Sequence, residues 1–363
     1  METKKKGFPA AFWVCACTEI FERLAYYLGR SLILIFVTAS VATGGLGLSD
    51  TVAANMQSNL TAFSYLLPLF GAVIVDKYIG ARYTTPVGMF IAAAGYFTGG
   101  IAKSATGVYA MIFLVSLGLA LFKNGAIIGR VITDKSQMDP AFSMRYTLVN
   151  VGAFIGTFLV GILYKDVFAK DGVLGFAPCF KMAALMMVLG GLWYIFVCWR
   201  FLGDLGKLPF KKTLTEEEKA AEAKKKEETG TKQPLTTIEK KRIGAIFVAS
   251  LFSIVFWIFW YRGYMPVYFY WAENMDWVVA GYQVPSTWFD AANSLFCVIL
   301  GPVTAALWKK LAARPQGDMS LFRKTGLGIA IIGVGYLFYA AIDILRGGEK
   351  ASVLWLIVFA FLL

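Results

Sequence analysis

The chain has 363 residues, of which 58% are hydrophobic, 16% are aromatic and only 16% are charged. Soluble globular domains have roughly 45–50% apolar and about 25% charged residues, so this composition excludes an ordinary soluble domain and predicts a helical protein with several membrane spans. The formal net charge of +12 does not predict nucleic-acid binding, because Lys and Arg are concentrated in alternate loops between the apolar segments.

Ten apolar segments are long enough, or nearly so, for the roughly 20 helical residues that cross a bilayer. They lie near residues 10–40, 53–75, 84–102, 106–129, 146–164, 178–201, 243–262, 285–308, 322–343 and 352–363. Loops on the side of the N-terminus hold about 25 of the 35 Lys and Arg, and the opposite loops hold about six, which predicts a cytoplasmic N-terminus. The short loops favour the plasma (inner) membrane of a prokaryote.

The order of these segments predicts an all-α polytopic membrane protein with the two-halved layout of a secondary transporter. Residues 1–202 form an N-terminal six-helix bundle, 203–242 a charged cytoplasmic linker, and 243–363 a partial C-terminal bundle of about four helices. The last segment, 352–363, would rise only about 18 Å as a helix. We therefore expect the chain to stop inside the tenth membrane helix of a longer protein.

The first apolar segment contains four charged residues, Glu19, Glu22, Arg23 and Arg30. Together with Tyr26 their spacing is i, i+3, i+4, i+7 and i+11, which places them on one face of an α-helix. Each charge would cost roughly 2.5–3.5 kcal/mol at the bilayer centre on insertion scales. This face is therefore predicted to line an interior path for a solute or protons; the alternative is an ion-pair network that only holds the bundle together.

Lys123 is a single charge within the fourth apolar segment. A lysine near a helix end can extend its ammonium group to the membrane surface, but the residues on both sides favour a buried position. We predict that Lys123 meets Glu19 or Glu22 across an interior cavity. Protonation of the carboxylate would then release the lysine and couple a proton to a conformational change.

The chain contains no histidine, and its five cysteines show neither a paired framework nor metal-ligand spacing. Any proton chemistry must therefore use carboxylates. No metal or cofactor is predicted, and no Ser or Cys nucleophile with a base indicates an enzyme.

The segment "EIFERLAYY" at 19–27 resembles the E-x-x-E-R-F-x-Y-Y motif of the proton-dependent oligopeptide transporters, a branch of the major facilitator superfamily. Other segments resemble further signatures of this family or superfamily. They are "FKNGAI" around Lys123 (F-K-P-N), "YTLVNVGAFIG" from Tyr146 (F-Y-x-x-I-N-x-G-A/S), "PLFGAVIVDKYIGAR" from Pro68 (the loop between helices two and three) and "VPSTWFDAANSLFCVILGP" from Val284 (the eighth helix).

The resemblance implies a major facilitator fold and a proton-coupled symporter that imports di- and tripeptides by alternating access. Its partners would be small peptides, protons and the lipid bilayer, with no nucleic acid and no obligate protein partner. The resemblance also assigns roles to matching positions. These are proton coupling for Glu19, Glu22, Arg23 and Lys123, substrate binding for Tyr26, Tyr27, Arg30, Asn150, Trp288 and Asn293, and a cytoplasmic latch for Asp76 and Arg82.

Several positions depart from the family pattern. The K-P-N of the fourth helix is Lys123-Asn124-Gly125, and the Glu of the seventh-helix motif is Tyr261. The family Gln of the eighth helix is Asp290. These departures leave two alternatives open: the same fold could carry another small anion or zwitterion, such as nitrate or an amino-acid derivative, or it could act as a non-transporting nutrient sensor.

Overall fold

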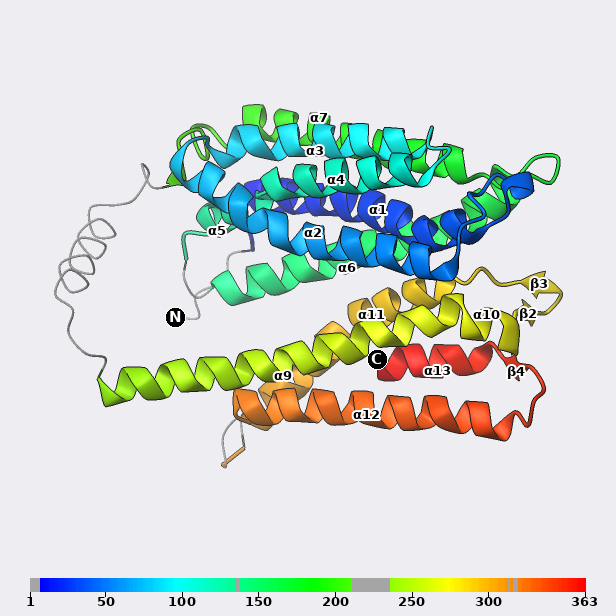
Figure 1. The fold of residues 1–363 in the computed structure, drawn as a ribbon. Helices are drawn as coiled ribbons and strands as arrows, with labels where there is room; N and C mark the ends of the chain where they lie inside the picture. Colours follow the sequence, from blue (N-terminus) through cyan, green and yellow to red (C-terminus); the bar gives the residue numbers. More distant parts are fainter. Residues whose placement is uncertain (1–6, 135–136, 211–235, 313, 316–318) are drawn as a thin grey trace. The chain divides into compact units, whose positions relative to one another are not determined.

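The computed structural model describes residues 7–134, 137–210, 236–312, 314–315 and 319–363 (Figure 1). Most of the predicted linker at 203–242 lies outside these residues. The described elements are α1 (Ala10–Thr38), η1 (Val41–Thr43), α2 (Asp50–Lys77), α3 (Ala81–Gly99), α4 (Ala105–Leu121), α5 (Asn124–Val131), α6 (Met138–Ile162), η3 (Leu163–Val167), α7 (Phe176–Arg200), α9 (Thr237–Tyr268), α10 (Tyr270–Asn274), β1 (Met275–Asp276), β2 (Val278–Val279), β3 (Tyr282–Gln283), α11 (Trp288–Ala312), α12 (Leu321–Leu345), β4 (Ala351–Ser352) and α13 (Leu354–Leu362).

Within the described ranges, seven helices are long and apolar enough to cross a membrane. They match seven of the ten predicted segments, and the protein is a multi-pass helical membrane protein. The other three predicted segments are also helical: α1 carries the interior charges, α3 has 19 residues, and α13 has 9.

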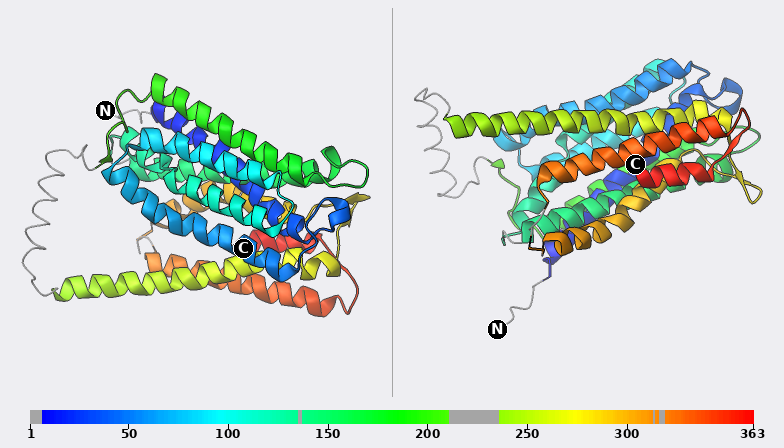
Figure 2. Two further views of the ribbon diagram at one scale, coloured as in Figure 1. Left: turned by 45° about the horizontal axis from the view of Figure 1, so that its top comes forward. Right: turned by 90° about the horizontal axis from the view of Figure 1, so that it is seen from below.

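The chain forms two compact units. The first contains residues 1–210 and 279–301, and the second contains residues 211–278 and 302–363. In the first unit, α1 lies along α6 and α7, α3 lies along α4 and α7, and α2 lies along α4 and α1. Two further views show the same order of helices (Figure 2).

Small residues allow α1 and α6 to approach closely. A Cβ atom on Gly156 would lie 2.5 Å from the Leu24 carbonyl oxygen, and one on Gly152 would lie 2.8 Å from the Ile20 carbonyl oxygen. Helices in membranes associate largely through close packing, and glycine permits the shortest distance between their backbones. The two glycines therefore fix where α6 lies against the charged stretch of α1.

One end of the first unit is a buried apolar core. It joins the start of α1 and α3 with the ends of α2 and α7 and with α5, through side chains that include Phe12, Val75, Ile127, Tyr194 and Val197. This core surrounds the first turns of α1, so polar groups that follow on that helix enter an environment with little water. Such groups need partners within the protein.

The fourth predicted span, 106–129, is not one continuous helix. α4 ends at Leu121 and α5 begins at Asn124, with Phe122 and Lys123 in non-helical conformations between them. The Lys123 amide donates to the Thr85 hydroxyl of α3 at 3.3 Å. The break turns the Lys123 side chain in a direction that a straight helix would not give it.

The second unit is held by aromatic and polar contacts of α9, α12 and α13. Tyr339 stacks on Phe359 with ring centroids 4.1 Å apart, and the Tyr336 hydroxyl donates to the Phe259 carbonyl at 2.5 Å. β1 and β4 pair in parallel. At its start, α9 has a capping box in which Thr236 and Glu239 satisfy each other's backbone N–H groups.

Candidate functional site

The charged face of α1 is buried within the first unit. The exposed fractions are 2% for Glu19, 0% for Glu22 and 7% for Arg30, so these three side chains lie inside the protein, whereas a quarter of the Arg23 side chain is exposed. The helical spacing explains the result, because one face of α1 points at α6 and the neighbouring helices while the other face is apolar.

Glu22 is paired with its neighbour in the sequence. The Arg23 guanidinium donates to both Glu22 carboxylate oxygens, through Nη2 to Oε1 at 2.5 Å and through Nε to Oε2. A bidentate Arg–carboxylate pair combines charge with fixed geometry. It also lowers the cost of keeping the Glu22 carboxylate away from water.

Cations and aromatic rings alternate along the next turn of α1. The Arg23 guanidinium lies 4.8 Å from the Tyr26 ring centroid, and the Arg30 guanidinium lies 5.8 Å from the Tyr27 ring centroid. The two tyrosine rings meet edge to face at 5.4 Å. Cation–π contacts favour the charged state of a partly desolvated arginine, so this column keeps two positive charges inside the bundle.

Arg30 also contacts Gln57 of α2. With the amide oriented to satisfy its neighbours, Gln57 donates to the Arg30 carbonyl at 3.1 Å and accepts from the Arg30 Nε at 3.3 Å. Gln57 is a member of the site that the sequence did not reveal, because a single glutamine in an apolar segment has no distinctive spacing. The contact orients the Arg30 guanidinium between α1 and α2.

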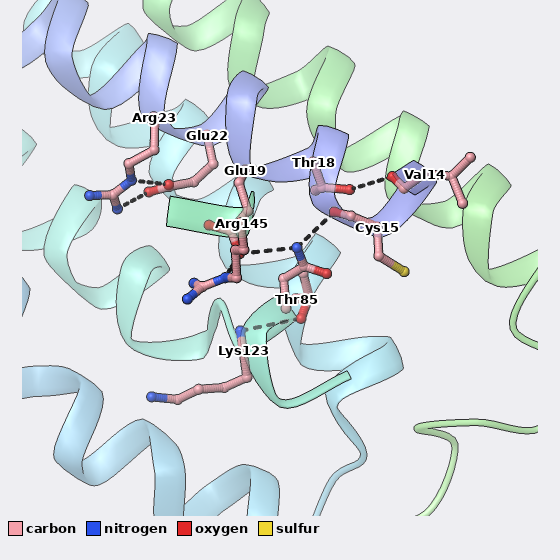
Figure 3. Close-up of polar contacts among 10 residues, drawn as sticks. Val14, Cys15, Thr18, Glu19, Glu22, Arg23, Thr85, Lys123 and Arg145 are labelled. Atoms are coloured by element: carbon pink, nitrogen blue, oxygen red, sulfur yellow. Dashed lines mark hydrogen bonds and ion pairs between the residues drawn. The ribbon is translucent and has the colours of Figure 1, made fainter. Parts of the chain in front are cut away.

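Glu19 is held by residues from two other helices (Figure 3). The Arg145 Nε of α6 donates to Glu19 Oε1 at 2.8 Å. The Asn124 Nδ2, at the first residue of α5, donates to the same oxygen at 3.1 Å and to the Cys15 carbonyl at 2.8 Å. Glu19 is therefore paired and hydrogen-bonded, as a buried carboxylate requires.

The predicted contact between Lys123 and the α1 carboxylates is wrong. The Lys123 ammonium donates to the Pro68 carbonyl of α2 at 2.9 Å, and its side chain runs away from Glu19 and Glu22 (Figure 3). The charge that acts on it is that of Asp76. The reason is the helix break at 122–123, which directs the side chain toward α2.

Arg145 was missed by the sequence analysis, although a signal was present. The family motif matched from Tyr146 begins F-Y, and Arg145 stands at the Phe position. A charge in place of a motif aromatic, at the start of an apolar segment, indicates a partner inside the bundle. Arg145 lies just outside the predicted span at 146–164. Basic residues at the end of a span are common in loops next to the membrane, so its position alone did not indicate a buried residue.

Arg82 bonds to the end of α7. Its Nη2 donates to the Cys198 carbonyl at 2.6 Å, its Nη1 donates to the Gly203 carbonyl, and its backbone N–H donates to the Gly206 carbonyl at 3.1 Å. In the described part of the chain no ion pair joins Arg82 to Asp76. A cation at a helix C-terminus stabilises the unpaired carbonyls there.

The turn after α7 contains an ion pair between Lys207 and Asp204. The Lys207 ammonium donates to the Asp204 carboxylate at 2.6 Å. This hydrogen bond, with the charge of Arg82 nearby, holds the pKa of Asp204 below its usual value. The Asp204 carboxylate therefore stays charged at neutral pH.

Replacing Arg82 with Gln is expected to destabilise the first unit. Hydrogen bonds to charged groups contribute about 1.5–3 kcal/mol each, and the change removes the charge from both carbonyl contacts at the end of α7. Thermal unfolding of the purified protein in detergent micelles measures the effect. The exposed Lys77→Gln change in the same loop is the matched control, and equal midpoints for the two variants would contradict the assignment.

The remaining predicted substrate residues, Asn150, Trp288 and Asn293, lie in the first unit. Trp288 stacks on Phe158 at 4.7 Å, and its Nε1 donates to the Phe158 carbonyl at 3.1 Å. Asn150 donates to the Tyr146 carbonyl of its own helix at 3.0 Å. Asn293 is buried in α11. In this conformation Trp288 supports the junction of α6 and α11.

Tyr261, at the position of the family's seventh-helix Glu, lies in an aromatic cluster of the second unit. Its ring centroid is 5.0 Å from that of Trp260 and 5.9 Å from that of Trp257. Arg262 follows it in α9 and is exposed. The described residues contain no group of three or more His, Cys, Asp or Glu that could hold a metal ion.

Comparisons with known proteins show what the chain is similar to. The POT family model matches residues 207–358. The di-/tripeptide transporter of Lactococcus lactis subsp. cremoris is 24% identical over 97% of this chain and 79% of that protein. The uncharacterized transporter YclF of Bacillus subtilis is also 24% identical, over 98% of this chain and 78% of its own length.

Solved structures share the fold. A POT family transporter in complex with 5-aminolevulinic acid has a TM-score of 0.84 and 23% identity, covering 99% of this chain and 82% of that one. Another, in complex with a thioalcohol-conjugated peptide, has a TM-score of 0.83 and 22% identity, covering 98% and 80%. The match over 207–358 and this common fold show that the chain is similar to the POT family over part of its sequence and to POT family transporters in its fold.

Proposed function

We propose that the protein is a proton-coupled symporter that imports di- and tripeptides by alternating access. The observation that carries this proposal is the buried face of α1, where the carboxylates of Glu19 and Glu22 lie on the same helix as Arg23, Tyr26 and Arg30. A zwitterionic peptide requires a cation, an anion and hydrogen-bonding groups in one interior space. Relatives named as di-/tripeptide transporters support the same cargo.

The proposed roles follow from these contacts. Glu19, Glu22 and Arg23 couple protons, since carboxylates are the acids available in a chain without histidine. Lys123 is assigned to this set because it stands in the segment that resembles the F-K-P-N motif.

Substrate contact is assigned to the aromatic, amide and cationic side chains of the first unit. They are Tyr26, Tyr27, Arg30, Asn150, Trp288 and Asn293. Asp76 and Arg82 form the proposed latch at the end of the bundle that holds the start of α1.

We place the N-terminus in the cytoplasm and the protein in the plasma membrane, because the basic loops lie on the N-terminal side. We assign no enzymatic reaction to it. The aromatic cluster around Tyr261 favours one alternative: without the seventh-helix carboxylate, the fold could carry nitrate or an amino-acid derivative instead of a peptide.

Competition in a counterflow assay separates these cargoes. Liposomes containing the protein and unlabelled dialanine are given labelled dialanine outside, together with trialanine, nitrate, alanine or N-acetylalanine. We expect trialanine to reduce the exchange and the other three to leave it unchanged, with protein-free liposomes as the control. Competition by nitrate or N-acetylalanine but not by trialanine would contradict peptide transport, and no exchange at all would favour a sensor.

A further inference from the structure

Two departures from the family motifs meet at one carboxylate, and a third packs against one of them. Asn124 stands at the Pro position of F-K-P-N, Gly125 stands at the Asn position, and Arg145 stands at the Phe position of F-Y-x-x-I-N. Asn124 and Arg145 both donate to the Oε1 of Glu19. Substitutions that are far apart in the sequence and meet at one atom form a common site.

Gly125 makes room for the Arg145 guanidinium. A Cβ atom at position 125 would lie 3.1 Å from the Arg145 Cζ, 3.2 Å from its Nη2 and 3.4 Å from its Nη1. An added Cβ atom would require the guanidinium to shift by a few tenths of an ångström. The glycine is therefore explained by the arginine that packs against it.

We propose that Arg145 takes the place of Lys123 as the cation that holds the Glu19 carboxylate, and that protonation of Glu19 releases it. This inference rests on the proposed function. A proton from water binds a carboxylate oxygen of Glu19 and gives a neutral carboxylic acid, while Arg145 keeps its charge. Asn124 remains bonded to the Cys15 carbonyl, so one donor stays in place when the ion pair opens.

The burial of the two partners supports a one-way release. Glu19 is 2% exposed, whereas 30% of the Arg145 side chain is exposed. Arg145 can move toward solvent, but a charged Glu19 left behind without its cation is costly. The pair therefore opens readily only when Glu19 is protonated, which links proton binding to the release of the Arg145 side chain.

The other ionisable groups around Glu19 are accounted for. Cys15 and Glu22 lie on α1 and interact with it electrostatically. Arg23 is engaged with Glu22, and Lys123 is engaged with the Pro68 carbonyl. Cys198 of α7 acts on Cys15. Arg145 is thus the cation bonded to Glu19 in the described part of the chain.

A titration that needs no transport tests the pair. The infrared band of a protonated carboxyl is followed with pH in the purified protein, and the difference from Glu19→Gln assigns the band to Glu19. In Arg145→Gln we expect the midpoint for Glu19 to move to higher pH, because removing a cation favours the neutral acid. Arg145→Lys should restore part of the shift, and Lys123→Gln should leave the midpoint close to that of the wild type.

Transport assays then test coupling. Arg145→Gln should keep dialanine counterflow and lose gradient-driven accumulation with a flatter pH profile, whereas Arg130→Gln on α5 should match the wild type. Gly125→Ala keeps the arginine and should give a smaller rise of the Glu19 midpoint and a smaller loss of gradient-driven accumulation. This variant tests the inference even if Arg145→Gln does not fold.

A midpoint that shifts with Lys123→Gln and not with Arg145→Gln or Gly125→Ala would overturn the inference. A shifted midpoint in a protein that moves no peptide would instead refute the proposed function alone.

Discussion

Replacing Glu22 with Gln is expected to abolish the accumulation of dialanine against its gradient while leaving counterflow in place. Glu22 is fully buried and receives two hydrogen bonds from Arg23. Glutamine has nearly the same shape but can neither gain nor lose a proton at neutral pH, so substrate exchange continues and the driving force is no longer used. The measurement is uptake of labelled dialanine by liposomes with an imposed proton gradient, run beside counterflow on the same preparation.

The matched control for Glu22→Gln is Glu273→Gln, which removes a carboxylate that is exposed on α10. It should behave as the wild type in both assays. Accumulation by Glu22→Gln at the wild-type level would show that the proton does not bind on this face of α1. Loss of counterflow as well would indicate a defect in substrate binding or folding.

Replacing Gly156 with Leu is expected to prevent assembly of the first unit. Even a Cβ atom at this position would lie 2.5 Å from the Leu24 carbonyl oxygen and 3.2 Å from the Leu24 Cα. Because both contacts are to backbone, α1 and α6 would have to move apart along the charged face. Overpacking of this kind costs about 1–3 kcal/mol for added methylenes, and a leucine adds four carbon atoms.

Yield of monodisperse protein and the thermal midpoint in detergent measure this effect. Gly156→Ala should lower the midpoint by several degrees, since about 1 kcal/mol corresponds to roughly 2–4 °C in a domain of this size. Gly333→Ala is the control, because a Cβ atom there meets nothing within 4 Å and alanine favours helix. A folded Gly156→Leu protein with a wild-type midpoint would contradict the packing described for α1 and α6.

The sequence was sufficient to predict the buried face of α1. Apolar residues set the orientation of a membrane helix, and charges at helical spacing must then point into the protein. The same argument could not identify the partners of those charges. It paired Lys123 with Glu19 or Glu22, whereas Glu19 bonds to Arg145 and Asn124 and Glu22 bonds to Arg23.

The partner of Lys123 depends on a local break in the chain. The residues at 122–123 leave the helix, and neither of them is a glycine or a proline that would signal it. The acceptor is a backbone carbonyl of α2, and a backbone group is present at every position, so side-chain patterns do not indicate which one is used. Such contacts are set by tertiary packing.

The end of α7 illustrates the same limit. The loop motif identified Arg82 as a residue of interest, but its acceptors are the carbonyls of Cys198 and Gly203. Trp288 was predicted to bind substrate, and in this conformation it stacks on Phe158. In both cases the residue could be selected from the motif, while its contacts required the arrangement of the helices.

The most direct test of the account is dialanine uptake by the wild-type protein in liposomes that are acidic outside and neutral inside. Proton-coupled peptide symport predicts that labelled dialanine accumulates above its external concentration, and that a protonophore returns it to the external level. Equal uptake with and without the gradient, or no uptake beyond protein-free liposomes, would contradict the central proposal.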